Sequence, residues 1–168
     1  MPLLGLLALL VRLKLGAPVL FRHQRPGLHG RPFTMLKFRT MTDTRDAQGN
    51  LLHDKERLTR FGLILRSASL DELPELFNVL KGDMSLVGPR PERPAFVHEF
   101  KHKIPDYMLR HRVRAGITGW AQVHGWRGNT SIKKRIQYDI YYIQNWSLLL
   151  DLKILWMTFR SGAWHNAY

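Results

Sequence analysis

The chain opens with an uninterrupted apolar run. Residues 1–11 read MPLLGLLALLV, and Arg12 and Lys14 close the run. A helix that spans a bilayer needs about 20 apolar residues, so this run is too short to cross a membrane alone. A signal peptide would begin with a basic region and end at a cleavage site, and neither is visible before Arg12. Two interpretations remain: a buried core helix, or a helix that dips into a membrane.

The next segments predict a small β-hairpin and a surface loop. Residues 18–24 and 32–39 have the composition of strands on either side of the turn-rich segment RPGLHGR. Gly27 and Gly30 in that segment could cradle a phosphate, but a simple turn is the favoured explanation. Residues 42–56 are polar and rich in turn formers, so we expect a surface loop there.

The remaining pattern is mostly helical. We expect helices over about 57–67, 70–81, 92–102, 131–142 and 148–160. Glycines and prolines break the pattern in GDMSLVGPRPERP and ITGWAQVHGWRG, which predicts irregular structure in both segments. No repeat, low-complexity run or linker is visible. The sequence therefore predicts one α+β domain over 1–168, mostly helical, with a small hairpin or sheet.

Composition narrows the class of partner. The 168 residues contain 26 Lys and Arg against 13 Asp and Glu, for a formal charge of +13 and a pI near 10.6. Such a charge favours anionic partners: nucleic acid, anionic lipid or phosphorylated substrates. A hydrophobic content of 45% argues against a disordered basic tail. The absence of cysteine from the sequence excludes disulfides and thiol catalysis.

The candidate chemistry lies in residues 60–91, where Asp71 and Glu72 are adjacent. Ser69 and Glu72 have the S-x-x-E spacing of a capping box, which predicts a helix that begins at Ser69. A helix start favours a bound anion, and adjacent carboxylates there could divide the work of attacking phosphorus and holding a metal ion. The alternative is that Glu72 only caps the helix. Pro74 leaves the first turn imperfect, which favours a functional role.

Several long motifs in order carry a resemblance to a known family. They are FRHQRPGLHGRPFTMLKFRTM at 21–41, SLDELPELFNVLKGDMSLVGPRP at 69–91, VRAGITGWAQVHGWRG at 113–128 and the end from YDIYYIQNWSLLLDLKILWMTF to NAY. The chain resembles the bacterial sugar transferases, the monotopic phosphoglycosyl transferases, over nearly its whole length. Within the family it is most similar to the undecaprenyl-phosphate glucose or galactose phosphotransferases.

The resemblance implies a two-step phosphoryl transfer. Asp71 is expected to be the nucleophile that attacks the β-phosphorus of a UDP-sugar, UDP-glucose or UDP-galactose, and expels UMP. Glu72, together with Asp71, is expected to hold Mg²⁺. The phosphate of a polyprenyl carrier, undecaprenyl phosphate, then takes the sugar phosphate from the aspartate. The product begins the assembly of a surface polysaccharide or glycoconjugate.

The resemblance also names binding residues. Arg66 matches a family arginine that contacts phosphate, and Arg127 falls near a second one. Arg90, Lys37 and Arg39 are further candidates for the diphosphate, because guanidinium and ammonium groups bind phosphate oxygens; Lys37 could equally be a surface charge. Asp139 is a weaker acidic candidate that could simply pair with an arginine. Two further positions depart from the family pattern, with Ala115 in place of proline and His124 in place of asparagine.

The resemblance places the chain at a membrane. Residues 1–15 match the returning half of a re-entrant membrane helix, with Pro2 at its break, and residues 16–168 match the catalytic region on the cytosolic face. We therefore expect the chain to be a fragment of a longer protein of the bacterial inner membrane, on the cytoplasmic face. Residues 148–160 have the Leu, Trp and Lys/Arg content of an interfacial amphipathic helix in contact with membrane lipids. Trp146, Trp156 and Trp164 could instead be core residues. Formation of a homo-oligomer is left open.

Two other functions compete with this one. His98-Glu99-Phe100-Lys101-His102 matches H-E-x-x-H, the zinc hydrolase pattern, but a catalytic zinc needs a third ligand. No glutamate follows Glu99 in the sequence, which removes the common downstream Glu ligand, although His111 or Asp106 could substitute. A nucleic-acid-binding domain would suit the charge, yet no zinc-finger or RNA-binding motif accompanies it. We expect no nucleic-acid partner.

Overall fold

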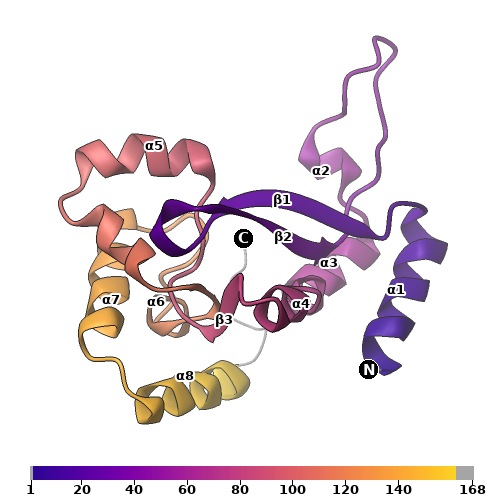
Figure 1. Ribbon diagram of the computed structural model, residues 1–168. Coiled ribbons are helices and arrows are strands. Elements are labelled where there is room, and N and C mark those ends of the chain that lie inside the picture. The colour runs from indigo at the N-terminus through magenta and orange to yellow at the C-terminus, as the bar shows by residue number, and fades with distance from the viewer. Residues whose placement is uncertain (1, 162–168) are drawn as a thin grey trace. The chain divides into compact units, whose positions relative to one another are not determined.

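The computed structural model describes residues 2–161. Its residue contacts divide the chain into two compact units, Met1–Arg22 with Leu36–Pro74 and His23–Met35 with Glu75–Tyr168, and each is described by itself. Among the described residues the structure contains eight α-helices and two two-stranded sheets (Figure 1). This confirms the predicted α+β class with a mostly helical chain.

The first unit is built around α1 (Pro2–Leu15), α2 (Asp54–Arg57) and α3 (Arg60–Ser67). Leu7, Val11 and Leu15 recur every four residues along α1, so they share one face and pack with Phe38 and Leu65 in a buried core. The helix predicted over 57–67 begins only at Arg60, where Thr59 caps it: the Thr59 Oγ1 accepts a hydrogen bond from the Gly62 N–H over 3.0 Å.

The other face of α1 is also apolar. Four of its leucines are more than half exposed: Leu3, Leu6, Leu9 and Leu13. At 14 residues, α1 is short, and none of the described helices combines the length and apolar character needed to cross a membrane. A helix that is apolar on both faces needs an apolar environment for its second face, in addition to the protein core that covers the first.

The predicted hairpin is confirmed, with strands β1 (Leu20–Pro26) and β2 (Pro32–Phe38). Its turn is a 3-10 helix over Leu28–Gly30, and Gly30 has a φ of 74°, which glycine adopts without steric cost. The Gly27 N–H donates to the Arg31 carbonyl over 2.8 Å. The two glycines therefore make a turn, as favoured from the sequence.

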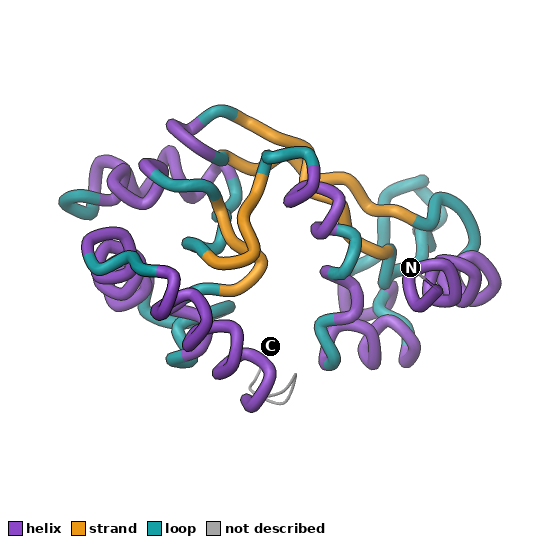
Figure 2. The backbone as a smooth tube through the Cα atoms, turned by 60° about the horizontal axis from the view of Figure 1, so that its bottom comes forward, coloured by secondary structure: helices purple, strands orange, loops and turns teal. Residues whose placement is uncertain are grey.

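After the hairpin, the second unit combines six further helical segments with a parallel strand pair; strands are orange in Figure 2. In chain order its elements are α4 (Glu75–Leu80), β3 (Met84–Val87), α5 (Pro94–Lys103), a 3-10 helix (Tyr107–Arg112), β4 (Ala115–Thr118), α6 (Trp120–Val123), α7 (Ile132–Gln144) and α8 (Leu148–Ser161). The helices predicted at 92–102, 131–142 and 148–160 correspond to α5, α7 and α8.

The strand pair contradicts the irregular structure predicted for its two segments. β3 and β4 run parallel, with Met84 opposite Ala115 and Val87 opposite Thr118. The glycines that made the sequence look irregular allow close backbone contact instead. A Cβ on Gly116 would lie 2.1 Å from the Gly88 nitrogen, and a Cβ on Gly119 would lie 2.1 Å from the Gly88 carbonyl oxygen. Any side chain at these positions would clash with backbone.

Helix α8 buries little of its apolar surface within the described chain. Ile154 is fully buried with Val87 and Tyr142, but Leu149 is 77% exposed and Trp156 is 58% exposed. Trp146, just before the helix, is 61% exposed, so the core interpretation is wrong for these two tryptophans. Trp164 and the terminal NAY motif lie outside the described residues. The exposed face of α8 has the composition expected of an interfacial helix.

Candidate active site

The two adjacent carboxylates lie on a single 3-10 turn, Leu70–Glu72, rather than on a regular helix. Ser69 has left-handed backbone angles, with φ 53° and ψ 21°, and its side chain makes no capping hydrogen bond. The predicted capping box is therefore wrong. So is the continuous helix over 70–81, because α4 begins only at Glu75, after Pro74, which has no N–H to donate. A single 3-10 turn lacks the regular helix start and the dipole that would favour a bound phosphate.

Backbone strain marks this turn. A positive φ costs a residue other than glycine about 1–3 kcal/mol and persists only where the surroundings impose it. Ser69 adopts it directly before Leu70, which packs with Leu73 against the core of the first unit. Asp71 is 9% exposed, so the turn holds one carboxylate at the edge of the protein interior.

Lys37 on β2 fixes the second carboxylate. Its Nζ lies 2.5 Å from Oε1 of Glu72, and the two side chains are 17% and 15% exposed. The sequence predicted a role for Lys37 toward the substrate diphosphate, and the structure brings it to the acidic pair instead of leaving it on the surface. A partly buried ion pair of this kind fixes the orientation of the Glu72 carboxylate.

Two further arginines of the first unit, Arg66 and Arg39, differ in the number of contacts that their guanidinium groups make. Arg66 on α3 donates from Nε to Oγ1 of Thr40 over 2.9 Å. Arg39 is only 8% exposed and donates to the carbonyls of Met41 and Ala17, and it pairs with Asp43 at 2.7 Å. The contacts of Arg39 give it a role in holding the chain around the hairpin. Its predicted contact with a diphosphate stays a prediction.

In the second unit a buried ion-pair network surrounds Arg110. Its Nη2 lies 2.8 Å from Oδ2 of Asp139, and both side chains are 2% exposed. The same nitrogen donates to the carbonyl oxygen of Arg90 over 2.7 Å, and Nη1 lies 3.7 Å from Glu92. Asp139 therefore pairs with an arginine, Arg110, which is the alternative that the sequence left open for it.

Burial and charge oppose each other in this network. Burial raises the pKa of Asp139 to about 6, although Arg110 acts in the opposite direction. Burial alone would lower the pKa of Arg110, but Asp139, Tyr107 and Glu92 outweigh it and raise that pKa. Arg110 is therefore a permanent buried cation. Its hydrogen bond to the Arg90 carbonyl holds the segment around Arg90 in place.

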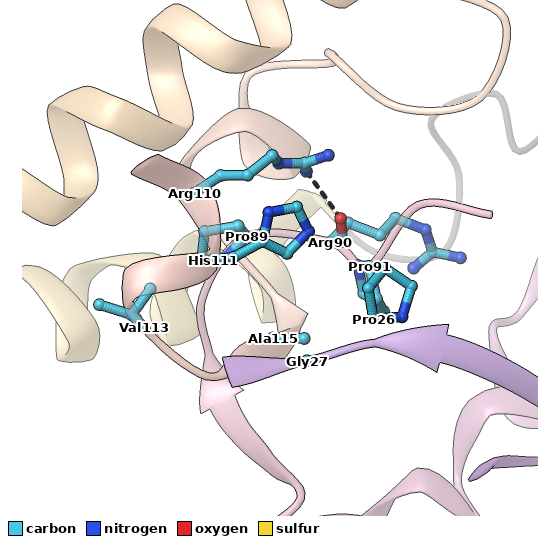
Figure 3. Close-up of a pocket in the computed structure, with 9 residues that line it drawn as sticks. All are labelled: Pro26, Gly27, Pro89, Arg90, Pro91, Arg110, His111, Val113 and Ala115. Atoms are coloured by element: carbon cyan, nitrogen blue, oxygen red, sulfur yellow. Dashed lines mark hydrogen bonds between the residues drawn. The ribbon is translucent and has the colours of Figure 1, made fainter. Parts of the chain in front are cut away.

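A small pocket lies beside this network (Figure 3). Only about 10 Å³ of it has room for the centre of a water-sized molecule, which is far less than the roughly 300–1,000 Å³ of ordinary ligand sites. The lining residues come from the hairpin turn, the proline-rich segment, and the stretch from the 3-10 helix to the start of β4: Pro26, Gly27, Pro89, Arg90, Pro91, Arg110, His111, Val113 and Ala115. Burial and then the charge of Arg110 lower the pKa of His111 to about 4. The pocket is therefore cationic through its arginines, with a neutral imidazole at neutral pH.

The carboxylates suit a metal that arrives with its substrate. Among residues 2–161 no group of three or more His, Cys, Asp or Glu side chains is placed to hold a metal ion. Mg²⁺ typically uses one or two carboxylates and completes its shell with water and substrate phosphates. Asp71 and Glu72 fit that requirement. The zinc pattern on α5 fits its metal less well, since Glu99 pairs with Lys103 at 2.8 Å and no described third ligand joins His98 and His102.

Sequence reasoning missed three members of the buried network: Glu92, Arg110 and Arg135. Arg135, in the first turn of α7, pairs with Glu92, which also faces Arg110. The spacing of Arg135 and Asp139, four residues apart on one helix, was a visible signal of an ion pair. The structure gives Asp139 a partner from a distant segment instead, so no local signal could have identified Arg110.

Comparison with known proteins decides the family. Residues 1–165 match the family described as bacterial sugar transferase. The chain belongs to the bacterial sugar transferase family. Membership confirms the resemblance seen in the sequence and identifies the chain as a sugar-phosphate transferase by class.

Individual relatives of this sugar transferase are similar along most of the chain. It is 55% identical to the uncharacterized sugar transferase EpsL of Bacillus subtilis (strain 168), over 89% of the chain and 72% of the relative. It is 48% identical to a UDP-glucose:undecaprenyl-phosphate glucose-1-phosphate transferase of Xanthomonas campestris pv. campestris, over 94% of the chain and 34% of the relative. Identity is 46% to a UDP-N-acetylgalactosamine-undecaprenyl-phosphate N-acetylgalactosaminephosphotransferase of Aeromonas hydrophila, over 95% of the chain and 39% of the relative. The chain thus spans little more than a third of the length of the last two.

Proposed function

We propose that this protein transfers a sugar 1-phosphate from a UDP-sugar to undecaprenyl phosphate and releases UMP. The observation that carries the proposal is the adjacent, partly buried Asp71 and Glu72, in a chain 48% identical to a UDP-glucose:undecaprenyl-phosphate glucose-1-phosphate transferase. A carboxylate is a competent nucleophile toward phosphorus and forms an acyl-phosphate.

The proposed reaction has two displacements at one phosphorus atom. In the first, a carboxylate oxygen of Asp71 forms a bond to the β-phosphorus, the bond from that phosphorus to the bridging oxygen breaks, and UMP leaves with the electron pair. In the second, a phosphate oxygen of undecaprenyl phosphate bonds to the same phosphorus and the aspartyl oxygen leaves. Asp71 returns to its carboxylate form. The product is an undecaprenyl diphosphate sugar.

The cationic side chains would neutralise the phosphates during both steps. Arg66 is held by a single hydrogen bond from Nε to Thr40, so its other donors suit a phosphate oxygen. Arg90 and Arg127 are proposed as further phosphate contacts. Phosphoryl transfer depends chiefly on positioning and charge stabilisation, which a chain of formal charge +13 supplies readily.

Asp71 and Glu72 are the residues that would hold Mg²⁺. Such an ion, when bound, would withdraw charge from the diphosphate oxygens and make UMP a better leaving group. The chain's own contribution is to hold the Glu72 carboxylate through Lys37, at 2.5 Å, beside the Asp71 carboxylate that would attack.

The donor sugar is proposed as glucose or galactose. Relatives of similar identity are named for glucose and for N-acetylgalactosamine, so the hexose itself needs a direct comparison. We also propose that the protein works at the cytoplasmic face of the bacterial inner membrane. The exposed leucines of α1 and the exposed apolar face of α8 support that location, since the polyprenyl acceptor resides in the bilayer.

The decisive test is transfer of label. The protein is reconstituted in undecaprenyl phosphate-containing membranes with radiolabelled UDP-glucose, UDP-galactose or UDP-N-acetylgalactosamine, and lipid-extractable label is counted. The proposal expects a lipid-linked product with at least one donor and none with Asp71→Asn. Glu99→Gln on α5 serves as the matched carboxylate control and should retain full transfer. His98→Ala would be the inactivating change if the chain were a zinc hydrolase.

A further inference from the structure

The loop between α6 and α7 carries Arg127 and has little regular structure of its own. Two of its residues, Gly125 and Gly128, have positive φ values of 80° and 64°. Residues 128–131 are exposed, and the local backbone contacts are short-range turns, such as the Arg127 N–H to the Gly125 carbonyl at 3.0 Å. Glycine-rich exposed backbone has high conformational entropy, so something else must fix this loop if it positions a side chain.

One buried arginine supplies that restraint. Arg135, 7% exposed, reaches back from the first turn of α7 into the loop. Its Nε donates to the Trp126 carbonyl over 3.2 Å, and its Nη2 donates to the Gly128 carbonyl over 2.7 Å. Nη2 also donates to Oγ1 of Thr130 over 3.1 Å. Arg135 therefore holds the backbone immediately before and immediately after Arg127.

The remaining donor of Arg135 connects the loop to the proline-rich segment. Its Nη1 pairs with Oε1 of Glu92, and the same oxygen lies 3.7 Å from Nη1 of Arg110. Arg110 in turn donates to the Arg90 carbonyl over 2.7 Å. Glu92 thus bridges two buried guanidinium groups, and each of them holds the backbone of a segment with a candidate phosphate-binding arginine.

We propose that Arg135 is a positioning residue for Arg127, and that Glu92 couples the 126–130 loop to the segment around Arg90 through Arg110. The inference rests on the proposed function for its meaning, because the anion that Arg127 and Arg90 would bind is the substrate diphosphate. Its structural content is independent of that function: Arg135 orders the loop.

The chemistry of the guanidinium explains why lysine cannot replace it. Arg135 makes its contacts in several directions from one planar group, whereas an ammonium is a single compact donor centre. Arg135→Lys keeps the charge opposite Glu92 but loses the fork that bonds the two carbonyls. The substitution therefore separates the restraint on the loop from the neutralisation of Glu92.

Hydrogen exchange tests the restraint directly. We expect amides of residues 126–130 to exchange at least about tenfold faster in Arg135→Lys than in the wild type, since each tenfold corresponds to ~1.4 kcal/mol of lost protection. Amides of β3 and β4 should keep their rates. Arg114→Lys is the matched control, because Arg114 is an exposed arginine with one backbone contact, from Nε to the Gly82 carbonyl at 2.9 Å. Unchanged exchange at 126–130 in Arg135→Lys would overturn the proposal.

A double-mutant cycle tests the link to Arg127. The readout is the Kd for UMP, measured by calorimetry, with Arg135→Lys introduced into the wild type and into Arg127→Ala. If Arg135 acts through Arg127, Arg135→Lys weakens UMP binding by about tenfold or more in the wild type. In the Arg127→Ala background the same substitution weakens it by less than about twofold. Equal losses in the two backgrounds would show that Arg135 acts elsewhere.

Two safeguards keep the test decisive. Should Arg135→Lys fail to fold, Thr130→Val removes one of the three loop contacts without disturbing the buried ion pair, and the same exchange rates are measured. Should wild-type protein fail to transfer sugar phosphate, the proposed function fails, while the exchange of residues 126–130 still decides the role of Arg135. The two failures are therefore distinguishable.

Discussion

The ammonium group of Lys37 lies 2.5 Å from Oε1 of Glu72, so a strand of the hairpin fixes the carboxylate beside Asp71. The contact joins β2 to a strained 3-10 turn that is otherwise short and irregular. It fixes the position of the Glu72 carboxylate on the same short turn that carries Asp71. We therefore expect Lys37 to affect catalysis through Glu72.

The first prediction concerns this pair. Lys37→Met should lower kcat by about tenfold or more, because a misplacement of the order of 1 Å at a catalytic group has effects of that size or larger. KM for the UDP-sugar should change less than kcat. Steady-state kinetics beside a thermal melt provide the measurement, with Lys133→Met on the exposed side of α7 as a control. Unchanged kcat in a folded Lys37→Met protein would show that the ion pair has no catalytic role.

The second prediction concerns Arg66. Arg66→Lys keeps the charge but loses the planar fork, so kcat/KM should fall by about tenfold, or ~1.4 kcal/mol, with little change in melting temperature. Thr40→Val, which removes the acceptor of the 2.9 Å hydrogen bond, should produce a smaller loss in the same direction. If the melting temperature of Arg66→Lys collapses while the folded fraction keeps normal kinetics, Arg66 is structural.

The third prediction concerns acid sensitivity. Burial and the charge of Arg110 lower the pKa of His111 from 6.5 to about 4, so the unfolded chain binds this proton between those pH values and the folded protein does not. Stability is therefore present above pH 6.5 and is lost as the pH falls through about 4. Relative to His111→Gln, the wild type should lose about 2 kcal/mol between neutral pH and pH 5.

Chemical denaturation at several pH values measures that difference. Asp139 acts in the opposite direction, since its pKa is raised to about 6 in the folded state, and its contribution is common to both proteins. Subtracting the His111→Gln curve therefore isolates His111. Parallel curves for the two proteins would contradict the prediction.

The fourth prediction concerns the exposed face of α8. Leu149, Leu152 and Trp156 are 77%, 55% and 58% exposed, and burying such a side chain in lipid contributes about 1.5–3 kcal/mol each. Replacing all three with polar residues should reduce recovery on anionic liposomes in a flotation assay. Leu51→Gln, at an exposed leucine of the 42–56 loop, is the control and should float as the wild type does. Equal flotation of the triple variant would rule out α8 as a membrane contact.

The sequence predicted the elements that depend on neighbouring residues and missed the pairing of segments that are far apart in the chain. The hairpin was predicted because the turn at Gly27–Gly30 and both strands are neighbours in the chain. Helices α5 and α7 were predicted because the helical composition of each segment is a local signal. The parallel pairing of Met84–Val87 with Ala115–Thr118 was missed, because nothing in either short segment indicates its distant partner.

The candidate site follows the same rule. Asp71 and Glu72 were identified from their motif, yet the local S-x-x-E pattern predicted the wrong backbone, since Pro74 ends the turn and Ser69 adopts a positive φ. The partner of Glu72 and the partner of Asp139 both come from distant segments, so the sequence identified Lys37, Glu72 and Asp139 as candidates without showing which residues pair with one another. Arg110, which pairs with Asp139, carried no local signal at all.

Trapping the intermediate tests the central claim most directly. Protein in detergent is mixed with UDP-glucose in the absence of undecaprenyl phosphate, quenched, digested and analysed by mass spectrometry, with released UMP quantified in parallel. The mechanism predicts a burst of UMP that approaches one equivalent per active protein, a hexose-phosphate adduct on the peptide that contains Asp71, and neither in Asp71→Asn. Transfer to undecaprenyl phosphate by the wild type with no adduct on that peptide, together with substantial activity of Asp71→Asn, would contradict it.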